Sequence, residues 1–142
     1  MQGKVIAVNT AEQRGTPKKN VEAGYLREGW GLEGDAHAGA WDRQISIFPL
    51  EAMALVPPSV MPTISEHDYS ENISIEGIPL NELKIGRRLK IGEAEVLICH
   101  IGKERFKEQG RPYIVSREGR FGTVVKSGRV AAGDLVILIE QE

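Results

Sequence analysis

The sequence has 142 residues, 41% hydrophobic and 27% charged, with a formal net charge of −2. This length and composition predict one soluble globular domain over residues 1–142, and argue against a membrane-spanning helix, which needs about 18 consecutive apolar residues. The first residues lack the apolar segment of a secretory signal, and the lone cysteine, Cys99, precludes an internal disulfide, so we expect a cytoplasmic protein.

The charges are unevenly distributed along the chain. Residues 1–83 contain 6 basic and 12 acidic side chains, whereas residues 84–129 contain 12 basic and 5 acidic ones. The basic segment is either a solvated face or a pocket or patch that binds an anion. Nucleic acid is not the expected partner, because the basic residues are not interleaved with an aromatic or helix-turn-helix pattern.

Short apolar runs rich in β-branched residues recur between glycines and predict strands. Two helices are also expected: one over 49–56, with Pro49 at its first position, and one over 103–109, ending at Gly110. The fold class is therefore mostly β, arranged as a closed barrel or a sandwich with a few short peripheral helices. The predicted strands are 4–8, 44–48, 72–75, 88–91, 95–101, 121–126 and 135–139.

Two details of these strands lead to further expectations. The run VLICHI (96–101) is apolar at nearly every residue, which predicts a strand covered on both faces and a buried, inert Cys99. The segments 86–98 and 128–139 both begin with Gly-Arg and pass through Gly-Glu or Gly-Asp to a long apolar run. Each is expected to form a tight hairpin that enters a barrel strand.

The stretch GDAHAG places Asp35 and His37 two residues apart in a glycine-rich loop. In extended backbone their side chains share one face, whereas in a turn Asp35 caps the local backbone. A metal site would need a third ligand such as His67 or His100, and this spacing is weak evidence for one, so no tightly bound metal is expected. Two interpretations remain: a loop whose side chains form hydrogen bonds with buried amides, and a loop that binds a ligand, which we favour.

Four motifs, in order, resemble the MOSC domain, named after the C-terminal domain of molybdenum cofactor sulfurases. They are GDAHAGAWDRQIS, ENISIEGIPLNELKIGRRLKIG, IGKE and RFGTVVKSGRVAAGD, and they span nearly the whole chain. The resemblance implies a standalone domain that is a closed or partly closed β-barrel, associated with the molybdenum cofactor (molybdopterin) or a precursor, and with sulfur carriage. It also implies a molybdoenzyme or cofactor-biosynthesis protein as partner, and pyridoxal phosphate binding in the family's larger fusions.

The candidate binding residues fit such a ligand, which has a pterin ring, a phosphate and a dithiolene. Arg43 is expected to pair with a phosphate or, equally, with Asp35 or Asp42. Glu71 and Asn72, at the head of a predicted strand, either contact a ring edge or cap the strand entry. Lys103 and Arg105 add charge at a strand end, although such residues are often only solvated.

The resemblance fails at one position. Standalone members carry a sulfur-carrier cysteine in a pattern like G-K-x-C, and here the fourth residue is Arg105, which cannot hold a persulfide. The favoured hypothesis is therefore a module that binds a pterin or another anionic ligand without covalent sulfur chemistry. The alternatives are a sulfur-transfer enzyme with Cys99 or a partner's thiol as its catalytic group, and a general anion-binding or interaction module. Whether the chain is an enzyme stays open.

Overall fold

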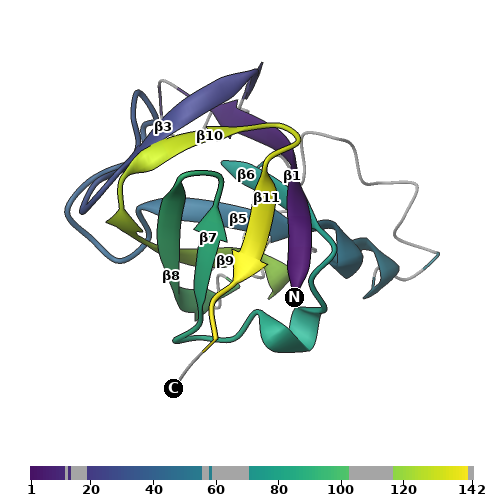
Figure 1. The fold of residues 1–142 in the computed structure, drawn as a ribbon. Helices are drawn as coiled ribbons and strands as arrows, with labels where there is room; N and C mark the ends of the chain where they lie inside the picture. The colour runs from purple at the N-terminus through teal and green to yellow at the C-terminus, as the bar shows by residue number, and fades with distance from the viewer. Residues whose placement is uncertain (12, 14–18, 56–57, 59–70, 103–116, 141–142) are drawn as a thin grey trace.

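The computed structural model describes residues 1–11, 13, 19–55, 58, 71–102 and 117–140. Figure 1 shows a fold built mainly of strands. No helix in these ranges is both long and apolar enough to cross a membrane. The elements are β1 (Gln2–Thr10), β2 (Lys19–Val21), β3 (Ala23–Arg27), β4 (Gly31–Leu32), β5 (Ile45–Pro49), η1 (Leu50–Leu55), β6 (Ile73–Glu76), η4 (Leu80–Glu82), β7 (Arg88–Ile91), β8 (Ala94–Ile101), β9 (Arg120–Lys126), β10 (Gly128–Ala131) and β11 (Leu135–Leu138).

Seven of the described strands form a closed barrel, in the order β1, β11, β7, β8, β9, β5, β6 and back to β1. The ring closes where β11 pairs antiparallel with β1, with Gly3 opposite Val136. β5 and β6 run parallel. The prediction of a mostly β, closed barrel is confirmed.

The barrel interior is filled by the inward-facing residues of these strands. β7 shows the alternation expected of a half-buried strand, with Leu89 and Ile91 fully buried and Arg88 and Lys90 exposed. The core extends through every strand of the ring and includes Val5, Val8, Ile45, Ile47, Ile73, Ile75, Leu89, Ile91, Val96, Ile98, Val124, Val136 and Leu138.

A second, three-stranded sheet of β10, β3 and β4 lies across one end of the barrel, at the top of Figure 1. The hairpin expected over 128–139 is therefore wrong, because β10 and β11 belong to different sheets. The N–H of Glu93 donates to the carbonyl of Arg129, so β10 runs over the β7–β8 turn. A side chain at Gly128 would lie 2.3 Å from the Glu93 carbonyl carbon, and this crossing therefore needs a glycine. The hairpin expected over 86–98 is present as β7–β8.

The helix expected over 49–56 differs in type and start. Pro49 is the last residue of β5, and the helix that follows is η1, a 3-10 helix. It lies outside the barrel (Figure 1), where the carboxylate of Glu51 accepts a 2.8 Å bond from the N–H of Gly77. The helix expected over 103–109 falls outside the described residues.

The expectation that β8 is covered on both faces is also wrong. Ala94, Val96 and Ile98 are buried, but Leu97 and Cys99 on the outer side are partly exposed. The pairing of β8 with β9 is irregular between Ile98 and His100, which places Cys99 at a β-bulge. Because Cys99 shares the outer side of β8 with Leu97, it is not the buried thiol that its apolar neighbours suggest, and the bulge leaves it unpaired with β9.

Candidate functional site

The glycine-rich loop between β4 and β5 is fastened to the barrel at its base. Gly31, which precedes the loop, has φ +127°, and a side chain there would lie 2.4 Å from the carbonyl oxygen of Gln44 at the far end of the loop. Only glycine combines this backbone conformation with so close an approach. The two ends of the loop therefore meet, and residues 33–43 project as a compact unit.

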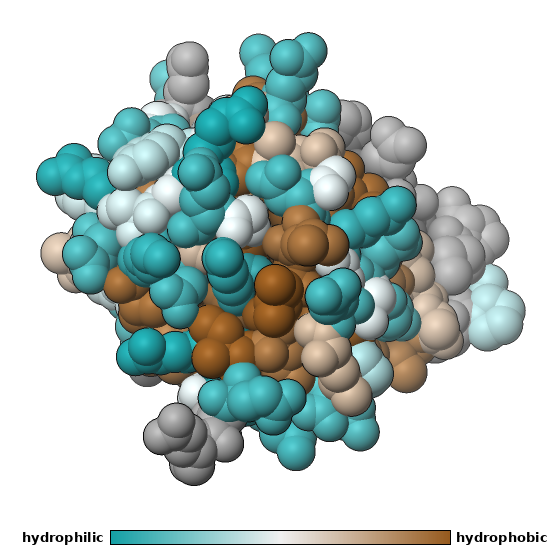
Figure 2. Space-filling model, viewed as in Figure 1, coloured by the Kyte–Doolittle hydropathy of each residue, from teal (hydrophilic) through white to brown (hydrophobic). Residues whose placement is uncertain are grey.

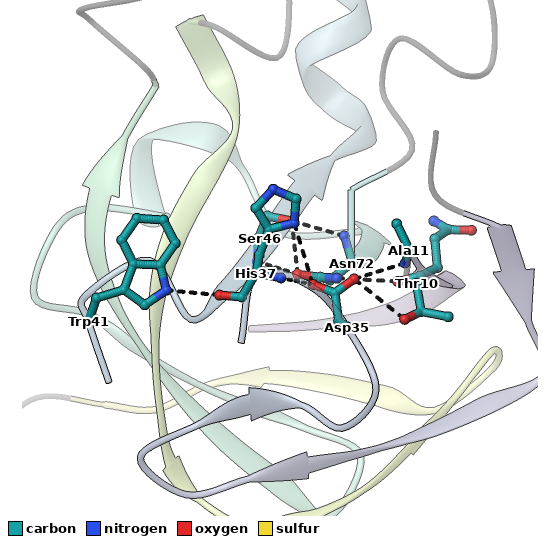
Figure 3. A network of polar contacts seen from close by, with 8 residues as sticks. Thr10, Ala11, Asp35, His37, Trp41, Ser46 and Asn72 are labelled. Carbon is teal, nitrogen blue, oxygen red and sulfur yellow. Dashed lines mark hydrogen bonds and ion pairs between the residues drawn. The ribbon is translucent and has the colours of Figure 1, made fainter. Parts of the chain in front are cut away.

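Asp35 anchors this loop to the end of β1 (Figure 3). Its buried carboxylate accepts bonds through Oδ1 from the N–H of Ala11 at 3.0 Å and from the hydroxyl of Thr10 at 3.4 Å. Oδ2 accepts a 3.1 Å bond from the N–H of His37, two residues on, which is an Asx turn. Of the two geometries expected for Asp35, the turn is the one observed.

His37 and Trp41 extend from the loop on the same side in Figure 3. Nδ1 of His37 lies 3.6 Å from Oδ2 of Asp35, and about a third of the His37 side chain is exposed, at 31%. The indole N–H of Trp41 donates a 2.8 Å bond to the carbonyl of His37. The loop thus presents an imidazole beside a buried carboxylate, on a residue whose backbone N–H and carbonyl are held by Asp35 and Trp41.

Asn72 joins three segments beneath the loop. Its Oδ1 accepts bonds from the N–H and the hydroxyl of Ser46, at 3.0 and 3.1 Å, and its Nδ2 donates to the carbonyl of Asn9 at 3.3 Å. Asn9 in turn donates through Nδ2 to the carbonyl of Glu71 at 2.8 Å. Asn72 is fully buried and Glu71 nearly so. The observed contacts of Asn72 hold β1, β5 and β6 together, and its contact with a ligand stays a prediction.

The end of the loop meets the end of β8 through Asp42 and His100. Oδ2 of Asp42 and Nε2 of His100 lie 2.6 Å apart. This hydrogen bond is the main reason why the pKa of Asp42 is lowered below its ordinary value, and the charges of His100 and Arg43 act in the same direction. The pair is at the surface, and it ties the loop to the strand opposite.

Arg43 lies beside this pair. Its Nη1 and Nη2 donate long bonds of 3.3 and 3.4 Å to the carbonyl of Gly102, and its guanidinium carbon lies 4.7 Å from the centre of the Phe121 ring. A guanidinium has five N–H groups in a planar fork suited to phosphate and carboxylate. The contact with Phe121 places the guanidinium between the end of β8 and the beginning of β9.

The structure therefore brings some of the predicted site residues together. Asp35, His37 and Arg43 share one loop, and Asn72 and Glu71 lie beneath it. Lys103 and Arg105 follow Gly102 directly in the chain but fall outside the described residues, as does His67. In the parts of the chain that are described, no three His, Cys, Asp or Glu side chains are grouped so as to hold a metal ion.

Three contributors to the site were not assigned these roles from the sequence: Trp41, Phe121 and the pair of Asp42 with His100. Trp41 and Asp42 belong to the loop motif GDAHAGAWDRQIS, so the sequence indicated that they lie near the site. Nothing in the sequence indicated that Asp42 pairs with His100, 58 residues away, because this contact depends on how the loop packs against β8.

The described basic residues of 84–129 do not all gather at this site. Arg120 is buried and donates through Nε to the carbonyl of Leu83 and through Nη2 to that of Leu80, both at 3.0 Å. Burial lowers its pKa, while the adjacent Glu118 opposes that shift. Arg88 and Lys90 lie on the outer face of β7. Part of the basic excess is therefore structural or lies elsewhere on the surface.

No protein-family model and no curated protein sequence matches the chain. Solved structures do. The YuaD protein from Bacillus subtilis has a TM-score of 0.73 at 20% identity, with 99% of this chain and 98% of that one covered. YiiM from Geobacillus stearothermophilus has a TM-score of 0.67 at 14% identity, covering 97% of this chain and 75% of that one. YiiM from Escherichia coli has a TM-score of 0.65 at 19% identity, covering 100% and 71%.

The fold is MOSC-like. At these identities the likeness concerns the fold alone, and it identifies neither a ligand nor an activity.

Proposed function

We propose that this protein is a binding module for the molybdenum cofactor, a precursor of it, or another anionic ligand that carries a pterin or phosphate group. The observation that carries the proposal is the position of Arg43, stacked 4.7 Å over Phe121 in the same loop as the partly exposed imidazole of His37. The same class of ligand is what the resemblance of the four sequence motifs to the MOSC domain implies.

The donor set fits the polar groups of such a ligand. The fork of Arg43 matches a phosphate, and among the described residues it donates to one carbonyl, that of Gly102, through bonds at the long end of the hydrogen-bond range. His37 offers a ring nitrogen to a phosphate or a pterin edge. Asp35 acts as a positioning residue, because its carboxylate fixes the backbone N–H of His37. When bound, the cofactor would supply molybdenum and dithiolene chemistry, and these residues would hold and orient it.

We propose non-covalent binding because Arg105 stands where a sulfur-carrier cysteine is expected. An arginine cannot form a persulfide. One observation favours the alternative of sulfur transfer: Cys99 is partly exposed, with its thiol 3.6 Å from the carbonyl of Leu97. The geometry around Arg43 supports binding more directly than it supports transfer, and we place transfer second.

The test is whether purified protein carries or takes up a pterin. Oxidative release should yield a fluorescent pterin from wild-type protein, or from protein incubated with molybdopterin, and the yield should fall in Arg43→Ala. Arg27→Ala is the matched control, because Arg27 also lies over an aromatic ring, that of Trp30 at 5.7 Å, but on β3. Equal pterin yields from the two variants, or no uptake of pterin by the wild type, would contradict the proposed function. Binding of inorganic phosphate without pterin would indicate the general anion-binding module.

A further inference from the structure

The outer face of β11 carries a row of apolar side chains. Leu135, Ile137 and Ile139 are two residues apart and therefore point to the same side of the strand. Leu135 is 54% exposed and Ile137 and Ile139 are partly exposed, whereas Val136 and Leu138 between them face the core. Figure 2, in the view of Figure 1, shows a hydrophobic area in the middle of this side of the molecule, bordered by hydrophilic side chains.

Cations flank this row on both neighbouring strands. Lys4 of β1 is opposite Leu135, and Lys90 of β7 is opposite Ile137. Arg88 accepts a 3.0 Å backbone bond from Ile139 through its carbonyl, so it lies beside the end of the row. All three cations are exposed, and the sequences of β1, β7 and β11 contain no acidic residue. Acidic side chains lie one strand farther from the row: Glu76 of β6 is opposite Lys4, and Glu95 of β8 is opposite Lys90 and 3.9 Å from Lys126.

We propose that this β11 face, formed by Leu135, Ile137, Ile139, Lys4, Arg88 and Lys90, is a docking surface for an acidic, amphipathic segment of a partner protein. An apolar row between two basic borders is complementary to a segment with apolar residues along its centre and carboxylates on both sides. Both edges of β11 are already paired, with β1 and with β7. The segment therefore binds through side chains and not by adding a strand.

Two other occupants fit the face less well. A second copy of this chain would bring Lys4, Arg88 and Lys90 against the same cations, which repel one another across a two-fold contact. A membrane surface is commonly bound through aromatic residues at the level of the headgroups. The exposed aromatic side chains of the described residues are Tyr25 on β3, Trp30 in the turn after β3 and Trp41 in the glycine-rich loop. They belong to other segments than the β11 face.

The test uses two synthetic peptides that share one row of leucines and differ only in their flanking residues, glutamate in one and lysine in the other. Binding to the full chain is measured by calorimetry and by NMR shift changes. The glutamate peptide should bind and shift the amides of β11, and its binding should weaken as salt rises. The lysine peptide should bind at least tenfold more weakly.

Two variants locate the binding on this face. Leu135→Glu and Lys90→Glu should each reduce the affinity of the protein for the glutamate peptide at least tenfold. Leu55→Glu is the matched control, because Leu55 is exposed to the same degree, 56% against 54%, but lies on η1. Failure of the glutamate peptide to bind, or an equal loss in all three variants, would overturn the proposal. So would binding of phosphatidylglycerol vesicles instead of the peptide, or a dimer that Leu135→Glu dissociates.

Discussion

Asp42 and His100 form a 2.6 Å contact between the end of the glycine-rich loop and the end of β8. The two residues are 58 positions apart in the chain, and Arg43, which follows Asp42, contacts Gly102 and Phe121 beside them. The loop is thus fixed at both ends: Asp35 fastens it to β1, and Asp42 fastens it to β8.

The first prediction concerns the titration of Asp42. Its carboxyl should titrate below its ordinary pKa of 3.8, because the ionised form is hydrogen-bonded to His100. The contribution of the ionised carboxylate to folding is present above that ordinary value and is lost as the pH falls through the lower, folded-state pKa. Carboxyl carbon NMR shifts followed against pH give the value directly. In His100→Ala the pKa should rise toward 3.8, and an unchanged titration would show that His100 is not the cause.

The second prediction concerns ligand-induced stabilisation. A ligand that binds only the folded protein raises the melting temperature, by an amount equivalent to about 2.7 kcal/mol at a ligand concentration 100 times the Kd. Inorganic phosphate or a pterin phosphate should raise Tm of the wild type, and Arg43→Ala should abolish the rise. Arg43→Lys should retain only part of it, because an ammonium keeps the charge but loses the planar fork. A full shift in Arg43→Ala would place the anion elsewhere.

Asn72→Ala should destabilise the protein by about 2–3 kcal/mol, because it leaves the buried N–H of Ser46 without the acceptor that Asn72 provides. Urea unfolding followed by circular dichroism measures this change. Asn20→Ala is the control. Asn20 also donates a side-chain bond to a backbone carbonyl, that of Val8 at 3.3 Å, but it is exposed, so its removal should cost less than about 1 kcal/mol. Equal costs for the two variants would contradict the importance of burial.

Gly122→Ala tests how closely β8 and β9 approach. A side chain at Gly122 would lie 1.9 Å from the carbonyl oxygen of Leu97, a distance that the backbone must open to accommodate. We expect a loss of about 1–3 kcal/mol in the free energy of unfolding. The neighbouring Thr123 is partly exposed, and Thr123→Ala should change stability far less. A variant Gly122→Ala as stable as the wild type would mean that the strands lie farther apart.

The fifth prediction separates binding from sulfur transfer. The partly exposed thiol of Cys99 should react with a thiol reagent in the folded protein, more slowly than after unfolding, and should accept little persulfide from a cysteine desulfurase. Arg105→Cys should accept persulfide, because the adjacent Lys103 favours a thiolate. That thiolate attacks the outer sulfur of the desulfurase persulfide and releases the desulfurase cysteine as a thiol. Stoichiometric persulfide on wild-type Cys99, absent from Cys99→Ser, would put sulfur transfer first.

The sequence predicted the strands that are apolar and β-branched, because burial of one face leaves a pattern of period two. The predicted range 88–91 is that of β7, and η1 begins one residue after its predicted start. β2, β3, β4 and β10 were missed, since they are short or interrupted by glycine and polar residues. The separation of β10 from β11 was not predictable either, because it results from β10 crossing the β7–β8 turn, a contact between distant segments.

Prediction of the site was limited in the same way. The loop motif indicated that Asp35, His37 and Arg43 lie close together, since they are neighbours in the chain. It could not indicate that Arg43 stacks on Phe121, which depends on the pairing of β5 with β9. The burial of Cys99 was predicted wrongly because a uniformly apolar run does not show that the outer face of β8 is left partly exposed, at Leu97 as at Cys99.

The pairing of β1 with β11 also bears on how the chain is synthesised. Until residues 135–138 have left the ribosome, β1 and β7 each lack a neighbour that the finished barrel provides. Unpaired strand edges are templates for pairing with other chains. A nascent chain stalled before Leu135 is therefore expected to be prone to aggregation and to depend on chaperones. Once β11 pairs with β1 and β7, these edges are covered and the tendency to aggregate should fall.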